Sequence, residues 1–291
     1  MHHLLTAKAA ATGTAIFMGG LGFENLLLNK TSRAYYFMRG SKPESSGENL
    51  MPVEHRHSHH SSRRHSSSDS HVEPGEKDAS FDMYIYSMTY QPEFCRENSS
   101  NSFAGCKKPN EEWEGQLTIH GLWPERNDGS WPATCTNEPL DTNLISSDTD
   151  LNSKLEEKWP NVKTSESSPS HTEFWAHEWS KHGTCSGLNQ HDYFSAALDL
   201  LLPTPPLVKS GYGSVVNRDE LIKEYGGPSM AIVVCKAGFL SEVRVCFGKE
   251  EGGKPADRME CPGVVLNEGT CGEKIKIASF DSSVDSVIKI D

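Results

Sequence analysis

Positive charge is scarce in this sequence: 28 Lys and Arg residues stand against 40 Asp and Glu, for a formal net charge of −12. Proteins that bind long nucleic acids through a broad, salt-dependent surface have the opposite balance. The composition excludes that class, so a few local groups must hold any anionic substrate. With 291 residues, of which 35% are hydrophobic, the chain is nevertheless long and apolar enough to bury a core.

Long apolar runs are scarce too. The longest, AAATGTAIFMGGLGF at residues 9–23, follows Lys8 in the order typical of a signal peptide. We therefore interpret residues 1–30 as a signal peptide or an N-terminal signal anchor. The run falls short of the ~20 continuous apolar residues of a membrane span, although a marginal anchor over residues 9–28 stays open. We expect no stable membrane span elsewhere.

Cysteine is absent from the first 94 residues, and no CxxC pair occurs. An even number of cysteines confined to one region favours four disulfides over a zinc cluster. Disulfides imply an oxidising compartment, so we expect the protein to enter the secretory pathway. Its destination would be the extracellular space or a compartment that resembles a vacuole or lysosome. Eight reduced cysteines in a cytosolic protein remain the alternative. The cysteines are Cys95, Cys106, Cys135, Cys185, Cys235, Cys246, Cys261 and Cys271.

Residues 31–79 have almost nothing to bury and include the tract HRHSHHSSRRHSSSDSH. This composition predicts a disordered His/Ser-rich linker. Loose metal binding by its histidines is the alternative, but the tract lacks a packed frame to hold the ligands. The histidines are His55, His57, His59, His60, His65 and His71.

From residue 80 onward, hydrophobic periodicity returns. Strands are expected at 81–90, at 116–124 with an end near Gly121 and Pro124, and as a hairpin at 229–238 and 241–250. Helices are expected at 150–160, 174–185, 191–202 and 217–226. This pattern indicates an α+β domain, residues 80–281, with a mainly antiparallel central sheet flanked by helices and stapled by disulfides. Residues 282–291 form a C-terminal tail.

The segment HTEFWAHEWSKHGTC, residues 171–185, concentrates ionisable side chains. A zinc helix needs two histidines at i, i+4, but His177 and His182 are five residues apart, about 140° around a helix. The pairs that do fall at i, i+4 are His177 with Lys181 and Glu178 with His182. A helix would present an acid, a cation and two imidazoles on one surface.

A nucleophilic mechanism would use Cys185, or Thr184 less readily, but a disulfide competes for the cysteine. The alternative is general acid–base chemistry on an anion, with Lys181 as a fixed positive charge. The second acid–base group would be His120, in TIHGLWP, where glycine and proline are expected to turn the chain.

TIHGLWPERNDGSWP and FWAHEWSKHGTC resemble the two active-site segments of the ribonuclease T2 family of secreted and vacuolar endoribonucleases. The resemblance covers residues 80–280 and implies cleavage of single-stranded RNA through a 2′,3′-cyclic phosphate to 3′-phosphate ends. It implies that His182 is the general base and His120 the general acid. His177 would hold the phosphate, and Glu178 and Lys181 would stabilise the extra negative charge.

The resemblance also assigns base-binding residues. Trp123 and Trp131 would sandwich the 5′-side base, Glu125 would read its edge, and Phe174 would stack in the second base site. It implies no cofactor and no metal. It also implies that DNA is not cleaved, because DNA lacks the 2′-OH. It further implies the disulfides Cys135–Cys185, Cys235–Cys271 and Cys246–Cys261, leaving Cys95–Cys106.

Further expectations follow from the secretory assignment and the length. Asn98 begins a possible glycosylation sequence, Asn-Ser-Ser, and we expect a monomer. Two rival hypotheses remain: a catalytically idle family member that binds or signals, and a metal-binding protein built on the histidine tract. The five residues His120, His177, Glu178, Lys181 and His182 occur together, which argues against an idle protein.

Overall fold

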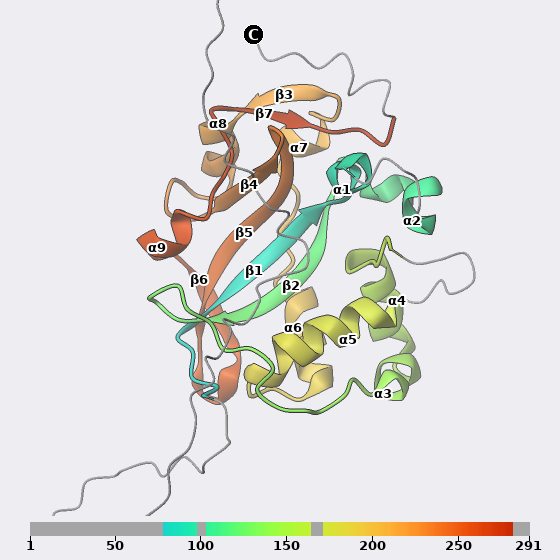
Figure 1. Ribbon diagram of the computed structural model, residues 1–291, viewed down its shortest axis with the longest axis vertical. Coiled ribbons are helices and arrows are strands. Elements are labelled where there is room, and N and C mark those ends of the chain that lie inside the picture. Colours follow the sequence, from blue (N-terminus) through green and yellow to red (C-terminus); the bar gives the residue numbers. More distant parts are fainter. Residues whose placement is uncertain (1–77, 98–102, 164–170, 282–291) are drawn as a thin grey trace, which may run out of the picture. The chain divides into compact units, whose positions relative to one another are not determined.

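The computed structural model describes residues 78–97, 103–163 and 171–281 (Figure 1). Within them lies a seven-stranded sheet. Its strands are β1 (Met83–Tyr90), β2 (Leu117–Glu125), β3 (Ser214–Asn217), β4 (Ile232–Lys236), β5 (Phe239–Lys249), β6 (Pro255–Met259) and β7 (Lys274–Ile277). The α-helices are α1 (Gln91–Glu97), α2 (Ala104–Lys107), α3 (Thr142–Ser147), α4 (Thr149–Lys158), α5 (Thr172–Lys181), α6 (Gln190–Asp199), α7 (Pro206–Lys209), α8 (Arg218–Glu224) and α9 (Gly263–Leu266).

The sheet is mainly antiparallel, as predicted. Its order is β2-β1-β5-β7-β3, with β4 and β6 also paired to β5. Of the pairings, β5 with β7 is parallel and the others are antiparallel. The strand β2 therefore forms one edge, and in Figure 1 the helices α3 to α6 gather on its side of the sheet.

The strand β1 lies between β2 and β5 and is buried along its whole length. Successive side chains of the strand point to opposite faces of the sheet. Tyr84 and Tyr86 belong to the large cluster that packs against the helices, while Met83 and Ile85 belong to a smaller cluster on the opposite face. Since both faces are covered, this strand is largely apolar, and its two polar residues, Ser87 and Thr89, are buried as well.

The predicted hairpin is confirmed as β4 and β5. Its two connecting residues, Ala237 and Gly238, have φ values of 48° and 80°. Positive φ at both central positions is typical of the tight turn that matches the twist of paired strands.

The four predicted helices are confirmed as α4, α5, α6 and α8. In α8 the Asn217 side chain accepts hydrogen bonds from the backbone N–H groups of Asp219 and Glu220, at 2.8 and 3.1 Å, which is an N-cap. The helix α5 is shorter than expected: it ends at Lys181, and a 3₁₀ turn follows at Gly183–Cys185.

The predicted end of the second strand near Gly121 is wrong. The strand β2 continues through Gly121 and Pro124 to Glu125. Proline is tolerated there because β2 is an edge strand, and an edge strand need not donate every backbone N–H to a neighbour. Glycine and proline in this segment therefore do not mark a turn.

Several expectations fall outside the described residues: the N-terminal segment 1–30, residues 31–77 of the linker, Asn98, and the tail 282–291. In the part of the chain that is described, no helix combines the length and the apolar character needed to cross a membrane.

Candidate active site

His120 is the extra residue of a β-bulge in β2. On β1, Ser87 pairs with Gly121 and Met88 pairs with Ile119, so His120 has no partner of its own in the register. A bulge bends the strand locally and re-aims the side chain that it carries. Two core indoles support this backbone, because Trp159 Nε1 donates to the His120 carbonyl oxygen at 2.9 Å and Trp175 Nε1 donates to the Trp159 carbonyl oxygen at 2.8 Å.

The helix α5 contributes the other four residues predicted for the site. Glu178 and His182 are buried, with 2% and 4% of their surfaces exposed. His177 is exposed and Lys181 is half-buried. His182 caps the end of the helix, and its backbone N–H donates to the Glu178 carbonyl oxygen at 2.9 Å. The structure thus places a histidine on the strand and the acid–base cluster of the helix side by side, with His120 Nε2 lying 4.0 Å from Glu178 Oε1.

The Trp123 indole joins the two halves of the site. Its Nε1 donates to Glu178 Oε2 at 2.9 Å. Its ring stacks on His182 with 5.3 Å between centroids, and it meets the His120 ring edge-on at 5.0 Å. Both imidazoles therefore contact one buried indole, which fixes their separation.

Glycine at position 121 permits this arrangement. A Cβ at Gly121 would lie 2.1 Å from Trp123 Nε1 and 2.2 Å from Glu178 Oε2. Neither atom is free to move, because the two are hydrogen-bonded to each other in the packed interior. Any side chain at this position would separate the indole from the carboxyl group.

The electrostatics favour the uncharged form of two residues on α5. Burial raises the pKa of Glu178, and the positive charges of His120 and Lys181 and the Trp123 hydrogen bond offset only part of that rise. Desolvation lowers the pKa of His177, and the charges of Lys181 and His120 lower it further. The charges of Lys181 and His120 therefore act directly on the protonation of His177.

Sequence reasoning missed Glu242 and Arg244 on β5. Glu242 Oε1 lies 3.0 Å from His120 Nδ1, and Arg244 donates to Glu242 Oε2 from Nε and Nη2 at 2.8 and 2.6 Å. A signal was present in SEVRVC, since buried charged residues at i, i+2 share one face of a strand and need partners.

The predicted base-binding residues differ in accessibility. Phe174 is half-buried, with its ring centroid 5.7 Å from that of His120, and Trp131 is half-buried in the segment after β2. Trp123 is 9% exposed and Glu125 is fully buried. In this structure little of the Trp123 ring and none of Glu125 is open to a base, so their roles in base recognition stay predictions.

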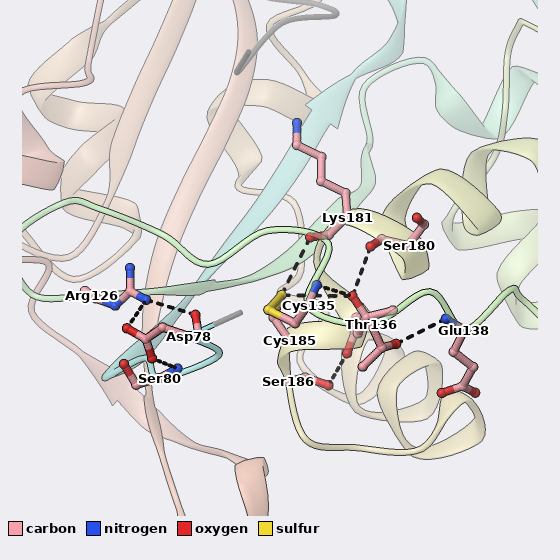
Figure 2. Close-up of a disulfide and its surroundings, with 12 residues drawn as sticks. Asp78, Ser80, Arg126, Cys135, Thr136, Glu138, Ser180, Lys181, Cys185 and Ser186 are labelled. Carbon is pink, nitrogen blue, oxygen red and sulfur yellow. Dashed lines mark hydrogen bonds and ion pairs between the residues drawn. A yellow bond between two sulfur atoms is a disulfide. The ribbon is translucent and has the colours of Figure 1, made fainter. Parts of the chain in front are cut away.

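The segment after β2 is fastened to the end of α5 (Figure 2). Cys135 and Cys185 form a disulfide, the Thr134 backbone N–H donates to the Lys181 carbonyl oxygen at 2.9 Å, and the Cys135 N–H donates to Thr184 Oγ1 at 3.1 Å. The Lys181 side chain extends away from this junction (Figure 2). Cys185 therefore has no thiol to act as a nucleophile.

The four disulfides pair as the family resemblance implies. They are Cys95–Cys106, Cys135–Cys185, Cys235–Cys271 and Cys246–Cys261.

Two other features of the molecule concern ligand binding. Within the described ranges, no group of three or more His, Cys, Asp or Glu side chains converges as metal ligands. The histidine tract lies outside these ranges, so metal binding there stays an untested alternative. A cavity of about 480 Å³ is lined in part by Ile222, Lys223 and Leu266, and no residue of β2 or α5 lines it.

Comparison with known proteins gives consistent matches. The model of the Ribonuclease T2 family matches residues 81–255. Intracellular ribonuclease LX of Solanum lycopersicum is 32% identical over 220 residues, covering 70% of this chain and 87% of the relative. Ribonuclease DdI of Dictyostelium discoideum is 30% identical over 218 residues, covering 70% and 87%.

Solved structures agree with these relatives. RNase NT in complex with 5′-AMP is 28% identical, with a TM-score of 0.51, and the match covers 68% of this chain and 98% of that one. An RNase-related protein from Calystegia sepium is 27% identical, with a TM-score of 0.53, and the match covers 68% and 97%.

Proposed function

The chain belongs to the ribonuclease T2 family and is an endoribonuclease, and from this premise we propose that it cleaves single-stranded RNA by metal-free acid–base transphosphorylation. The observation that supports this most directly is the pair of imidazoles, His120 and His182, held against the single indole of Trp123 at centroid distances of 5.0 and 5.3 Å. In-line displacement at phosphorus needs a base for the attacking oxygen and an acid for the leaving oxygen.

In the proposed first step, His182 removes the proton of the ribose 2′-OH, and the 2′-oxygen attacks the adjacent phosphorus. His120 donates its proton to the departing 5′-oxygen as the P–O5′ bond breaks. The products are a 2′,3′-cyclic phosphate and a free 5′-OH end. In the second step water opens the cyclic ester to a 3′-phosphate, with the two histidines exchanging roles. DNA is not cleaved because it lacks the attacking hydroxyl.

The remaining residues of α5 stabilise charge on the phosphate. Lys181 supplies a fixed cation to the pentacovalent state, and His177 holds the phosphate. Because burial raises the pKa of Glu178, this carboxyl group is protonated over a wider pH range than an exposed one. In its neutral form it donates a hydrogen bond to a phosphate oxygen, whereas a carboxylate would repel that oxygen.

Base recognition is assigned to aromatic side chains near the two histidines. Phe174 is accessible beside His120 and is assigned to the second base site, while Trp131 is assigned to the 5′-side base. Trp123 and Glu125 would contact that base only after the buried edge of β2 opens. We also propose that the enzyme acts as a single chain in the secretory pathway, with residues 1–30 as its targeting segment and Asn98 as a glycosylation site.

The decisive experiment is cleavage of a single-stranded RNA oligonucleotide by the full, oxidised chain in EDTA, with the product ends identified by mass. We expect cyclic phosphate ends, and we expect His120→Ala and His182→Ala each to lower kcat by at least ~100-fold, the typical contribution of a general acid or base. Lys154→Gln, on the exposed face of α4, is the matched control and should leave the rate unchanged.

Intact RNA between pH 4 and 8, from protein shown to be folded, would contradict this proposal and favour an idle, RNA-binding family member. Cleavage that EDTA abolishes would contradict the metal-free mechanism alone.

A further inference from the structure

His120 is held by a carboxylate from a strand that is not its neighbour. Glu242 lies on β5, and β1 separates β5 from β2 in the sheet. The carboxylate reaches His120 Nδ1 at 3.0 Å above Ser87 of β1, whose hydroxyl donates to Glu242 Oε2 at 3.3 Å. Ser87 and Glu242 are buried, with 0% and 4% of their surfaces exposed. The contact therefore depends on a small residue in the strand between them.

The two oxygens of Glu242 have separate partners. Oε2 accepts from both Nε and Nη2 of Arg244, whose Nη1 donates to Glu268 Oε2 at 2.7 Å. The guanidinium also lies 5.3 Å from the centre of the Trp123 ring. A carboxylate that served only to pair with Arg244 would offer it both oxygens. Here Oε1 faces His120 instead.

The chain of contacts keeps Glu242 ionised. Burial by itself would raise its pKa, but the charges of Arg244 and His120, and their hydrogen bonds, hold the pKa of this carboxyl group well below its usual range. An ionised acceptor fixes the ring tautomer of a histidine that donates to it.

We propose that Glu242, clamped by Arg244 and Ser87, is a positioning residue that accepts the Nδ1–H of His120 and so directs the proton on Nε2 toward the leaving 5′-oxygen. This inference rests on the proposed function. During cleavage the Nε2 proton passes to O5′ as the P–O5′ bond breaks, while the Nδ1 proton stays in its hydrogen bond to Glu242. His120 ends as a neutral imidazole whose bare Nε2 accepts a proton from water in the hydrolysis step.

Other groups around His120 do not fill this role. Glu178 and His177 of α5 face it, with Lys181 one turn further along the helix. Glu178 Oε1 lies 4.0 Å from Nε2, which is the other ring nitrogen from the one that contacts Glu242. Glu242 is the carboxylate that contacts Nδ1.

The test is Glu242→Gln in the full chain, with Glu273→Gln, an exposed position, as the matched control. Two substrates with the same 5′-side base are compared: a dinucleoside phosphate, and the nucleoside 3′-(4-nitrophenyl phosphate). A 4-nitrophenolate leaves without help from an acid, whereas a ribose 5′-oxygen needs it. A residue that acts through the general acid therefore affects the first substrate more than the second.

For Glu242→Gln we expect kcat on the dinucleoside phosphate to fall by ~10- to 100-fold, as for other residues that orient a functional histidine. KM should stay within about twofold, and the nitrophenyl ester should lose less than about threefold, on the same general-acid reasoning. His120→Ala should show the same contrast between substrates, and Glu273→Gln should match the parent enzyme.

An equal loss on both substrates, or no loss on either, would overturn the assignment. If the parent enzyme cleaves neither substrate, the proposed function fails, and the positioning role is then judged by nitrogen-15 NMR of the His120 ring. Nδ1 and Nε2 shifts that are the same in the parent and in Glu242→Gln would rule that role out, and a changed tautomer would support it.

Discussion

Burial of the Glu178 carboxyl group lowers the free energy of unfolding, although the same group is assigned a role in the proposed reaction. It is 2% exposed, and its Oε2 accepts a hydrogen bond from Trp123 at 2.9 Å. Burial raises its pKa above the ordinary value of 4.5, so the folded protein binds a proton here that the unfolded chain has already released. The free energy of unfolding therefore decreases as the pH rises from about 4.5 to the raised pKa, and the cost persists above it.

Glu178→Gln should remove that cost. Glutamine keeps the shape and the carbonyl acceptor for Trp123 but never ionises, so we expect Tm at pH 7 to rise by about 2–4 °C, the shift that ~1 kcal/mol gives in a domain of this size. Near pH 4 the gain should vanish, because both states of the parent are then protonated. Thermal denaturation from pH 4 to 7 checks this. A gain that is equal at all pH values would contradict it, and RNA cleavage by the same variant should be weaker throughout.

At this scale the sequence indicated side chains that the structure brings together, but not the Glu242–Arg244 pair that contacts His120. His120, His177, Glu178, Lys181 and His182 stand in two short motifs, whereas Glu242 and Arg244 lie at least 60 residues after His182. Their contact with His120 depends on which strands are neighbours, and local periodicity does not contain that information. The burial of Trp123 was missed for a similar reason: its partner, Glu178, comes from another element.

At the scale of elements, β2 shows how a local signal can be misread. Glycine and proline predict a turn at residues 121–124, but the strand runs to Glu125. Gly121 is needed for the close approach of Trp123 and Glu178, and Pro124 is tolerated at the sheet edge. The irregularity is a bulge at His120, whose position is set by the pairing with β1. The sequence of β2 by itself does not reveal how β2 pairs with β1.

The junction between the β2 segment and α5 yields a prediction about elements. The Cys135–Cys185 disulfide spans 50 residues and lies three residues from His182. Replacing both cysteines by serine should cost roughly 4 kcal/mol on the chain-entropy model. Because the covalent link between the segment after β2 and the end of α5 is then lost, we also expect kcat to fall by about 10-fold in protein that is still folded, in line with the sensitivity of catalysis to ~1 Å displacements.

The matched control is the double serine variant of Cys95 and Cys106, a disulfide that spans 11 residues and joins α1 to α2. It should cost roughly 3 kcal/mol by the same model and leave kcat unchanged. Urea denaturation and RNA cleavage, measured on both variants below their transition midpoints, separate the two effects. Equal kcat values in the two variants would show that the junction does not position His182.

At the scale of the whole molecule, hydrophobic periodicity and the cysteine distribution correctly indicated a disulfide-stapled α+β fold. The order of the strands could not be predicted from the sequence, because it is set by contacts between segments that are distant in the chain. The parallel pairing of β5 with β7 and the central place of β5 among four partners are examples. Such contacts arise only when the helices of the β2 side and the strands of the C-terminal half assemble around one core.

Net charge leads to the last prediction. With a formal charge of −12, the molecule repels RNA at long range, so binding at α5 depends on the cations at the site. At pH 7 Lys181 is charged, while the lowered pKa of His177 leaves that ring neutral. One neutralised phosphate gives a slope of about −0.7 in a plot of log kcat/KM against log salt concentration for single-stranded RNA. Screening of the overall repulsion makes the slope shallower still.

At a pH below the lowered pKa of His177, protonation of that ring adds a second cation, so the slope should steepen toward about −1.4. Cleavage of an oligonucleotide from 20 mM to 300 mM salt measures both slopes. His177→Ala should abolish the difference between the two pH values, and Lys154→Gln on exposed α4 should leave it intact. A slope steeper than about −3 at pH 7 would mean that at least four phosphates are neutralised at once. RNA would then follow an extended cationic path across the surface, contrary to local binding at α5.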